Sequence, residues 1–374
     1  MKINFNVYGY NNSYGKFKIH TSDLYNLTNN ITEAVIDITS NKIGSFLFKI
    51  YPNNEAFKKL LPLETDIVVE EENEKGHEQI FTGILLNRKS FADENLNIGM
   101  EITCISSHIF FKYRPVCVIN NVIKDKNIRE YKYTSKNFID SILMSLQGCQ
   151  EEFDVNRYSF DKQKTDQVIK QFSASYNEEE SLNRLILDSI HFYELNLNFI
   201  YDFNTHMHIF YFNKQDDATI ASFKYGDLVY NYSDEFDYSS FANCIYLSGK
   251  EVQNTTVTAV AKTTDPISIK KYGSFRVNRT CDIDNLAVIE SEVKRQLTLA
   301  KEPQTSFNIE FIDQKNIVKL NRKIKIINEA LGTTAEFFIK KINFDLSAPY
   351  VKKIELKNIK FNYIKTLAKI YRGK

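Results

Sequence analysis

Residues 65–113, TDIVVEEENEKGHEQIFTGILLNRKSFADENLNIGMEITCISSHIFFKY, set out the plan on which the fold depends. They contain a strand-like run, a polar turn with one glycine, a strand with phenylalanine, a longer turn and a third strand, and they end in Ile-x-Phe-x-Tyr. Residues 321–363, NRKIKIINEALGTTAEFFIKKINFDLSAPYVKKIELKNIKFNY, follow the same plan, and Ile109–Tyr113 aligns with Ile359–Tyr363 without a gap. We interpret the two stretches as copies of one β-rich unit, although alternating strands can also resemble one another by chance.

The pattern extends outward from both copies. Alternating apolar residues at 34, 36 and 38 and at 46, 48 and 50 predict further strands, so the first β region covers residues 1–118. Strand patterns return from residue 241 to the end of the printed sequence, interrupted by one predicted helix at 284–301. Leu286, Ile289, Val293, Leu297 and Ala300 line one face of that helix, which an aspartate at 282 or 284 caps and Pro303 ends.

The middle of the chain has a different pattern. Helices are predicted at 135–147 and 178–192, and a β-hairpin pairs Leu195–Tyr201 with Met207–Phe212. The expected fold class is α+β, mainly β, with two similar β-barrel domains flanking a small α+β domain. The domains are a first β-barrel domain (1–118), a helical or irregular connector (119–164), an α+β domain of helix plus hairpin (165–240), and a second β-barrel domain with an inserted helix and a basic C-terminal tail (241–374).

Composition favours a folded protein without a global charge signal. The 48 basic and 47 acidic residues leave a net charge of +1, which gives no indication of nucleic-acid or membrane binding by the whole chain. The N-terminus lacks the apolar core of a secretory signal, no run is long enough to span a bilayer, and no membrane insertion is expected. The five cysteines are far apart and form no CxxC, so we expect reduced, mostly buried thiols.

Motifs for chemistry are missing from the sequence. It contains no HExxH, GxSxG, GxxxxGK[ST] or GxGxxG pattern. His206 and His208 fall on one face of a strand and could begin a zinc site, but we expect them to be exposed residues of a hairpin turn. Cys149 follows a predicted helix end, where the helix dipole disfavours a thiolate, and Cys104 and Cys244 lie in buried strand patterns. The sequence therefore predicts no catalytic residue, no cofactor and no metal.

Charge is unevenly distributed even though the total is small. Residues 60–80 carry seven acidic residues and one lysine, whereas residues 351–374 carry eight basic residues and one glutamate. Such complementary patches suit head-to-tail or layered assembly. Lys365, Lys369 and Arg372 in the basic tail are candidates for docking to a partner, and a short amphipathic helix for an anionic surface is the alternative.

The stretch DPISIKKYGSFRV, residues 265–277, contains a single glycine between two strand-like pieces. Phosphate-binding loops use several glycines before a helix. We therefore expect Tyr272 and Gly273 to form a structural turn at a barrel corner rather than a ligand site.

Two areas resemble the baseplate hub and tail-tip proteins of phage tails and phage-tail-like bacteriocins. The first runs from IGSFLFKIYPNN through the Phe-x-Gly strand EQIFTGILLN to the Cys strand and the segment KYRPV. The second comprises SFANCIYLSGK, then DPISIKKYGSFRV, the helix at 284–301 and EFFIKKINFDLSAPYVKKIELKN. Each motif is weakly specific, but their order covers most of the chain.

The resemblance implies a non-enzymatic homotrimer with two similar barrels in each subunit, which adapts a sixfold tail tube to a threefold central spike. It further implies partners in the tail tube or tube-initiator protein, the spike and the tape-measure protein, with DNA only in transit through the lumen. The expected location is the baseplate of a virion or phage-tail-like particle, made in the bacterial cytoplasm. The alternatives are a tail-associated cell-wall hydrolase or protease and a host-surface receptor-binding module of the tail.

Overall fold

The computed structural model describes residues 4–22, 29–73, 76–93, 96–112, 130–133, 157–161, 174–177, 195–214, 216, 218–224, 229–237, 241–251, 258–280, 286–301, 304–313, 316–328 and 333–357. These residues form two compact units. Those within Met1–Asn231 and Ile309–Leu356 make up the larger unit, and those within Tyr232–Asn308 make up the smaller one. Within the described part of the chain, no helix is long and apolar enough to cross a bilayer.

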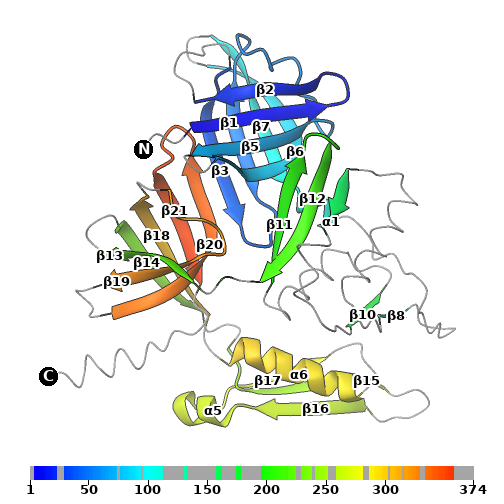
Figure 1. Cartoon of the computed structure of the whole chain (residues 1–374). Helices are drawn as coiled ribbons and strands as arrows, with labels where there is room; N and C mark the ends of the chain where they lie inside the picture. Colours follow the sequence, from blue (N-terminus) through cyan, green and yellow to red (C-terminus); the bar gives the residue numbers. More distant parts are fainter. Residues whose placement is uncertain are drawn as a thin grey trace. The chain divides into compact units, whose positions relative to one another are not determined.

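The larger unit is built mainly from strands (Figure 1). Its N-terminal half contains β1 (Asn4–Asn11), β2 (Gly15–Thr21), β3 (Thr32–Thr39), β4 (Ser45–Ile50), β5 (Asp66–Asn73), β6 (Gly76–Ala92), β7 (Ile98–Ser106) and α1 (Ile109–Lys112). Two small sheets follow, formed by β8 (Glu130–Tyr133) with β10 (Ala174–Asn177), and by β9 (Tyr158–Phe160), β11 (Leu195–Asp202) and β12 (Met207–Lys214). The C-terminal half contains β13 (Thr219–Lys224), β19 (Lys323–Asn328), β20 (Thr333–Asp345) and β21 (Val351–Lys357). It also contains the start of β14 (Val229–Asp237) and the end of β18 (Gln304–Ile312), whose other residues belong to the smaller unit.

One large sheet runs through both halves in the order β14-β18-β21-β20-β3-β4-β7-β6-β5-β1-β2, with β19 beside β20 and β13 beside β19. The N-terminal half therefore has the order β3-β4-β7-β6-β5-β1, and the C-terminal half has β14-β18-β21-β20-β19-β13. Strands that hold the same place in these two orders also follow one another in the same order along the chain. Among the described strands, only β2 has no counterpart in the C-terminal half. One difference is that β1 is antiparallel to β5, whereas β13 is parallel to β19. The repeated strand order supports the duplication predicted from the sequence.

Strand β20 joins the two halves. Its N-terminal part pairs with β19, where Phe338 lies opposite Lys323, and its C-terminal part pairs with β3, where Lys341 lies opposite Thr39. The outer edge of β3 is thus covered by β20, and the sheet continues instead of curling back on itself. The prediction of a mainly β fold is confirmed, but none of the described sheets closes into a barrel.

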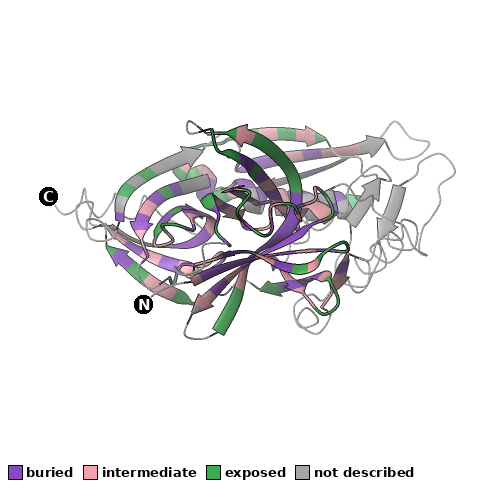
Figure 2. Cartoon of the chain, turned by 90° about the horizontal axis from the view of Figure 1, so that it is seen from above, coloured by how far each residue is buried: buried purple, intermediate pink, exposed green. Residues whose placement is uncertain are grey.

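The core of the large sheet comes from side chains at alternate positions (Figure 2). On β3, Ala34 and Ile36 are buried, and on β4 the buried side chains are Phe46, Phe48 and Ile50. The predicted alternation is confirmed on β4 and for Ala34 and Ile36 on β3, whereas Ile38 is only partly buried. Because successive side chains of a strand point to opposite faces, this pattern places every second residue in the core.

The smaller unit has a three-stranded sheet with a helix on one face. It contains β15 (Cys244–Glu251), β16 (Thr258–Thr264), α5 (Pro266–Tyr272), β17 (Arg276–Thr280) and α6 (Leu286–Ala300), with the strand order β16-β15-β17. Ile289, Val293, Leu297 and Ala300 on α6 pack on Ile245 and Leu247 of β15. The predicted helix and most of its apolar face are confirmed, but Leu286 is 49% exposed.

The stretch from Asp265 to Gly273 differs from its prediction. Ile267 and Ile269, predicted as strand residues, lie in α5, so this prediction is wrong. The carboxylate of Asp265 caps the helix by accepting a hydrogen bond of 2.9 Å from the backbone N–H of Ser268. At the other end the N–H of Gly273 donates to the carbonyl of Ile269, and the ring of Tyr272 meets that of Phe241 edge-on. Gly273 therefore ends a short helix.

We expect Gly273→Ala to reduce the free energy of unfolding of the smaller unit by about 1–3 kcal/mol, because a side chain strains this backbone conformation. Gly273 has φ 83° and ψ 177°, and an added Cβ would meet no atom within 4 Å, so no steric clash contributes. Urea unfolding monitored by circular dichroism measures the change, with the adjacent Ser274→Ala as the control. Equal unfolding midpoints for the two variants would refute the backbone explanation.

Several sequence predictions meet the structure only in part. The Ile-x-Phe-x-Tyr element that ends the first repeat begins as a short helix, α1, over residues 109–112. Cys104 and Cys244 are buried and free, as expected. The predicted helices at 135–147 and 178–192, three cysteines (Cys117, Cys149 and Cys281), and the basic tail with Lys365, Lys369 and Arg372 lie outside the described residues.

Candidate functional site

A buried polar network lies between the N-terminal half of the large sheet and the β11–β12 hairpin. His208 on β12 is fully buried, and its Nε2 lies 3.1 Å from Oδ1 of Asp66 on β5. Its Nδ1 lies 2.8 Å from Oγ of Ser107, which follows β7 and is itself fully buried. Ser107 Oγ in turn lies 2.9 Å from the hydroxyl of Thr82 on β6. Four segments distant in the sequence therefore meet in one chain of hydrogen bonds.

Asp66 has two further partners. Nη2 of Arg157 lies 2.5 Å from its Oδ1, and the hydroxyl of Tyr201 donates to its Oδ2 at 3.1 Å. Burial alone would raise the pKa of Asp66, but the hydrogen bonds from His208 and Arg157 and the charge of Arg157 outweigh it and hold this pKa below its usual value. Burial lowers the pKa of His208 despite the nearby carboxylate. A neutral His208 then donates from Nε2 to Asp66 and accepts at Nδ1 from Ser107.

The network contains the three residue types of a serine hydrolase triad, Asp66, His208 and Ser107. In such enzymes the serine hydroxyl must reach a substrate carbonyl and a donor pair must stabilise the oxyanion. Here the hydroxyl of Ser107 is fully buried and is held between His208 and Thr82. The arrangement fits the anchoring of β12 to the sheet, with the hydroxyl of Ser107 enclosed by its neighbours.

The two histidines of the His-Met-His motif have different environments. His206 is exposed, as expected, and its ring stacks on that of Tyr10 at 3.8 Å between centroids. The expectation that His208 is also exposed is wrong, because His208 shares the inward face of β12 with the buried Phe210 and Phe212. Among the described residues, no group of three or more His, Cys, Asp or Glu side chains could hold a metal ion.

The hairpin is anchored at further points. Gln79 of β6 exchanges two hydrogen bonds with the backbone of Tyr201, at 2.9 and 2.7 Å. The side chain of Asn41 likewise donates to the carbonyl of Leu195 and accepts from the N–H of Leu197. The side chains of Asn41 and Gln79 thus bond to the backbone of β11 as a neighbouring strand would. They fix where the hairpin lies along the large sheet.

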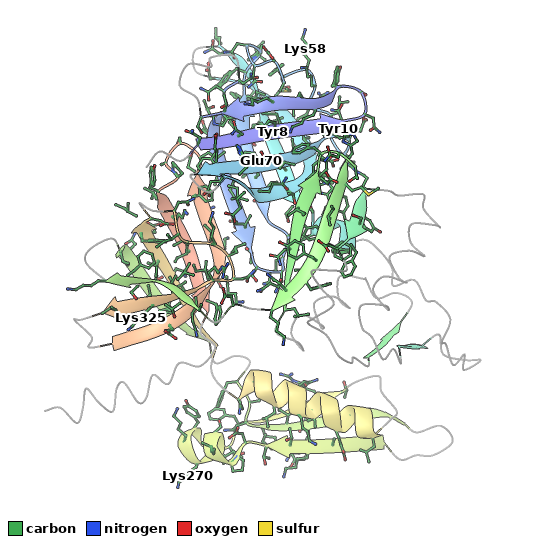
Figure 3. All side chains as sticks on the ribbon, in the orientation of Figure 1. Tyr8, Tyr10, Lys58, Glu70, Lys270 and Lys325 are labelled. Carbon is green, nitrogen blue, oxygen red and sulfur yellow. The ribbon has the colours of Figure 1, made fainter. Side chains whose placement is uncertain are left out.

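Aromatic side chains hold the tip of the hairpin against β1. Tyr8 and Tyr10 project from β1 near Glu70 (Figure 3). The ring of Tyr8 meets Phe203 of the hairpin turn edge-on at 5.9 Å, and Nζ of Lys16 lies 3.6 Å from the centroid of the Phe203 ring. These contacts combine aromatic and cation–π attraction.

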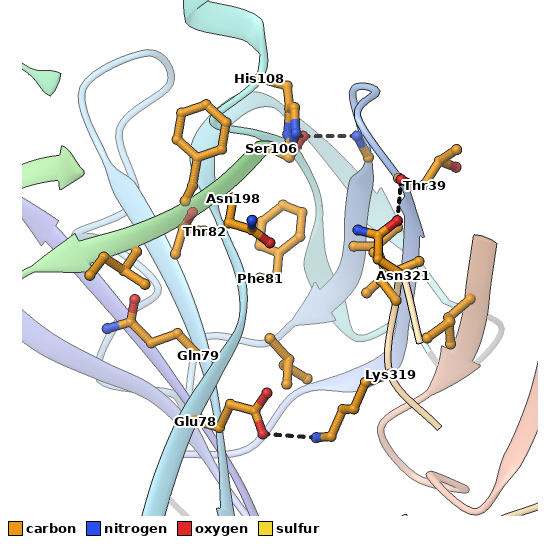
Figure 4. Close-up of a pocket in the computed structure, with 18 of the residues that line it drawn as sticks. Thr39, Glu78, Gln79, Phe81, Thr82, Ser106, His108, Asn198, Lys319 and Asn321 are labelled. Carbon is orange, nitrogen blue, oxygen red and sulfur yellow. Dashed lines mark hydrogen bonds and ion pairs between the residues drawn. The ribbon is translucent and has the colours of Figure 1, made fainter. Parts of the chain in front are cut away.

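A cavity of about 540 Å³ lies beside β6 within the larger unit (Figure 4). Its walls come from the β3–β4 connection, β6, β11, the segment before β19, and β20. His108 and Ser106 lie at one end, and an ion pair between Glu78 and Lys319 lies at the other. Burial lowers the pKa of His108 to about 4, so its imidazole is neutral at pH 7.

The charged end of the cavity contains two lysines. Nζ of Lys319 lies 2.9 Å from Glu71 and 3.1 Å from Glu78, and these carboxylates outweigh burial and raise its pKa. Lys352 is buried, donates to Asp313 at 2.9 Å and to Oδ1 of Asn316, and burial lowers its pKa. The cavity thus combines a fixed polar end with apolar walls, which is typical of binding sites.

The sequence did not predict that the residues of the network, or those of the cavity, lie close together. The predicted structural turn at Tyr272 and Gly273 lies in the smaller unit, whereas the network and the cavity lie in the larger unit. One signal for the network was available, because His208 alternates in step with Phe210 and Phe212 and such a position points inward. The residues that line the cavity show no comparable alternation in the sequence.

Three solved structures that share this fold are tail proteins, two of them from prophages. Prophage tail protein gp18 from Listeria monocytogenes EGD-e covers 98% of this chain and 98% of its own, with a TM-score of 0.59 and 14% identity. A tail protein from Neisseria meningitidis MC58 covers 95% and 97%, with a TM-score of 0.60 and 11% identity. The 43 kDa tail protein of prophage MuSo2 from Shewanella oneidensis covers 94% and 98%, with a TM-score of 0.59 and 12% identity. No family model and no curated protein matches the sequence.

Proposed function

We propose that this chain is a non-enzymatic structural subunit of a phage or phage-like tail, acting as the baseplate hub. The observation that carries this proposal is the fold, which the chain shares over nearly its whole length with tail proteins of three prophages or bacteria. The hub role is consistent with the resemblance of the two sequence areas described above.

The repeated strand order supports a trimer with six similar faces. Each chain carries the order β3-β4-β7-β6-β5-β1 and its counterpart β14-β18-β21-β20-β19-β13. Three chains would therefore present six related barrel-like domains, which can match a sixfold tube on one side and a threefold spike on the other. The tape-measure protein and then DNA would pass through the lumen, and the particle's baseplate would be the site of action.

The basic tail supplies a candidate docking segment for this assembly. Lys365, Lys369 and Arg372 could contact an acidic surface of a neighbouring subunit or tail protein, because opposite charges steer docking.

The expected result in solution is a particle of three times the 43.6 kDa chain mass, measured by light scattering or native mass spectrometry. Cryo-imaging of tails from the producing strain should place this chain on the axis between tube and spike. A chain that stays monomeric alone and with tube and spike proteins, and that never copurifies with a tail, would contradict the proposal. Clearing of peptidoglycan in a zymogram would instead favour a hydrolase.

A further inference from the structure

Strand β11 is an edge strand of its small sheet, and the cavity beside β6 lies along that edge. The other edge of β11 pairs with β12, where Phe199 lies opposite Phe210. Five consecutive residues of β11, 197–201, line the cavity. Successive side chains of a strand point to opposite faces, so a wall made of consecutive residues means that the cavity adjoins the edge of β11 rather than one of its faces.

Hydrogen bonds to the large sheet show where the backbone of this edge points. Gln79 donates to the carbonyl of Tyr201 and accepts from its N–H. Asn41 accepts from the N–H of Leu197 in the same way. Along an antiparallel strand these groups alternate between the two edges, so Phe199, midway between Leu197 and Tyr201, also points its N–H and carbonyl away from β12. Among the described residues neither group of Phe199 has a hydrogen-bond partner, so one donor and one acceptor are unpaired beside the cavity.

An occupant of this edge needs an acceptor and a donor at the spacing of a strand. A peptide residue that lies antiparallel to β11 has both, because it exchanges two hydrogen bonds with the residue opposite. A carboxylate or an ionised phosphate supplies acceptors only, so the carbonyl of Phe199 would remain without a donor. From Leu197 to Tyr201 the strand rises about 13 Å, and the side chains of Asn41 and Gln79 close the edge at either end. The edge therefore suits a short extended segment.

The charges that line the cavity favour a segment with a carboxylate. The lining contains three lysines and two glutamates. Lys319 forms ion pairs with both glutamates, and Lys352 pairs with Asp313, which lies outside the lining. Lys42, the third lysine, is exposed and has no partner among the described residues. An acidic side chain or a terminal carboxylate in the cavity would pair with Lys42.

Lys42 also sets the direction of the segment. It follows Asn41, whose side chain bonds to the backbone at the start of β11. Glu78 and Gln79 lie together at the other end of the cavity (Figure 4). A segment antiparallel to β11 has its C-terminal end toward Lys42 and its N-terminal end toward Glu78. The carboxylate therefore belongs on the C-terminal side of the residue that pairs with Phe199.

The remaining wall is apolar and mixed. Aliphatic side chains such as Val318, Leu320 and Ile342 contribute to it. Five aromatic residues contribute as well, namely Phe81, Phe199, Tyr201, Tyr211 and Phe344. Such a wall favours apolar side chains on the segment without selecting aliphatic over aromatic ones.

We propose that this cavity binds an extended peptide segment of a partner protein, which adds antiparallel to the edge of β11. One residue of the segment exchanges two hydrogen bonds with the backbone of Phe199, its apolar side chains contact the cavity wall, and a carboxylate C-terminal to that residue pairs with Lys42. Addition of a strand to an exposed edge is a common way in which proteins bind peptides. The inference goes beyond the tail role and does not depend on it.

Hydrogen exchange of single amides, measured by mass spectrometry, tests the unpaired donor. In the isolated chain the N–H of Phe199 should exchange at least tenfold faster than those of Leu197 and Tyr201, which donate to Asn41 and Gln79. Equal protection of the three amides would overturn the proposal. Protection of Phe199 that grows with protein concentration would show that a second copy occupies the edge, and it would overturn the assignment to a different partner.

A fluorescein-labelled probe with the sequence Gly-Ala-Val-Ile-Asp tests binding by fluorescence anisotropy. One probe should bind per chain, with a dissociation constant below about 1 mM. Two further probes are N-methylated on valine or on isoleucine, and their affinities should differ at least tenfold, because adjacent N–H groups of an extended segment point to opposite edges. Absence of saturable binding, or equal affinities of the two methylated probes, would overturn the proposal.

Matched variants locate the site. Lys42→Glu should weaken binding of the probe at least fivefold, whereas Lys58→Glu should leave it unchanged, because Lys58 is also exposed but lies outside the cavity. A probe that ends in lysine instead of aspartate should prefer the Lys42→Glu variant over the wild type. Equal effects of the two lysine variants would indicate general charge attraction and would refute the site. All of these measurements use the isolated chain, so they remain valid even if the chain forms no trimer.

Discussion

Asp66→Ala is expected to reduce the free energy of unfolding of the larger unit by about 3–5 kcal/mol. The carboxylate of Asp66 is 5% exposed and accepts hydrogen bonds from Arg157, Tyr201 and His208. Its removal leaves the buried hydroxyl of Tyr201 and the buried imidazole N–H of His208 without their shared acceptor, whereas the guanidinium of Arg157 is 33% exposed and keeps its bond to the carbonyl of Leu63. A buried donor that loses its acceptor costs about 1–3 kcal/mol, so the two buried donors account for most of the loss. Urea unfolding followed by tyrosine fluorescence measures the effect.

Two further variants test the reason for this loss. Asp66→Asn retains the shape and an oxygen acceptor, so its destabilisation should be smaller than that of Asp66→Ala. Asp202→Ala, in the hairpin turn, removes a carboxylate whose bonds to Asn204 and Thr205 are at the surface, and it should cost no more than about 1 kcal/mol. If Asp66→Ala and Asp202→Ala had equal effects, the buried network would not anchor the hairpin.

The larger unit is also expected to lose stability steeply as the pH falls from 6.5 to 4. Burial lowers the pKa values of His20 and His108 to about 4 each, and it lowers that of His208 as well. These groups are neutral when folded but take up a proton near pH 6.5 when the chain unfolds. Protons therefore stabilise the unfolded chain below pH 6.5, and His20 alone accounts for about 3 kcal/mol at pH 4. Asp66, whose pKa is lowered, adds to the loss only near and below pH 4.

Urea midpoints between pH 8 and pH 4.5 test this dependence. His20→Asn, which cannot take up the proton, should flatten the decline below pH 6.5 relative to the wild type, although it lowers stability at pH 8. A wild-type chain whose midpoint does not change between pH 7 and pH 5 would show that these imidazoles bind protons as readily in the folded state as in the unfolded one, and it would contradict the lowered pKa values.

Strands with clear alternation were predictable from the sequence because a half-buried sheet imposes a period of two on its side chains. The hairpin pairing Leu195–Tyr201 with Met207–Phe212 and the strands around Ile36 and Phe48 are confirmed for this reason. Helix α6 was equally visible from the spacing of Ile289, Val293 and Leu297. In these elements the spacing of apolar residues along the chain matches the face that tertiary packing buries.

Helix α5 shows how a short alternation misleads. Ile267 and Ile269 suggested a strand, but Ile267 is 81% exposed and its spacing reflects no buried face. The Asp-Pro start and the Gly end were the stronger signals, because aspartate caps a helix, proline suits its first turn and glycine follows its last. A seven-residue helix offers too few positions for apolar periodicity to compete with its capping residues.

The network and the cavity could not be predicted, because their partners are far apart along the chain. His208 meets Asp66 across 142 positions, and Lys319 meets Glu71 across 248. Nothing local to either residue specifies such a contact, which depends on the order of strands in the sheet. The sequence repeat predicted that the two halves share a plan, but it did not predict that β20 would join them into one sheet.

The elements of the smaller unit from β15 to α6 are inserted in the chain between β14 and β18. These two strands are neighbours in the sheet, and they correspond to the β3–β4 hairpin of the first half. Adjacent strands lie about 5 Å apart, so the insertion begins and ends at nearly the same point. Such a position tolerates the exchange of one folded insert for another without altering the strands that flank it. Natural variation among relatives of this chain should therefore concentrate in this cassette, and a designed binding module could be grafted in its place while the large sheet is retained.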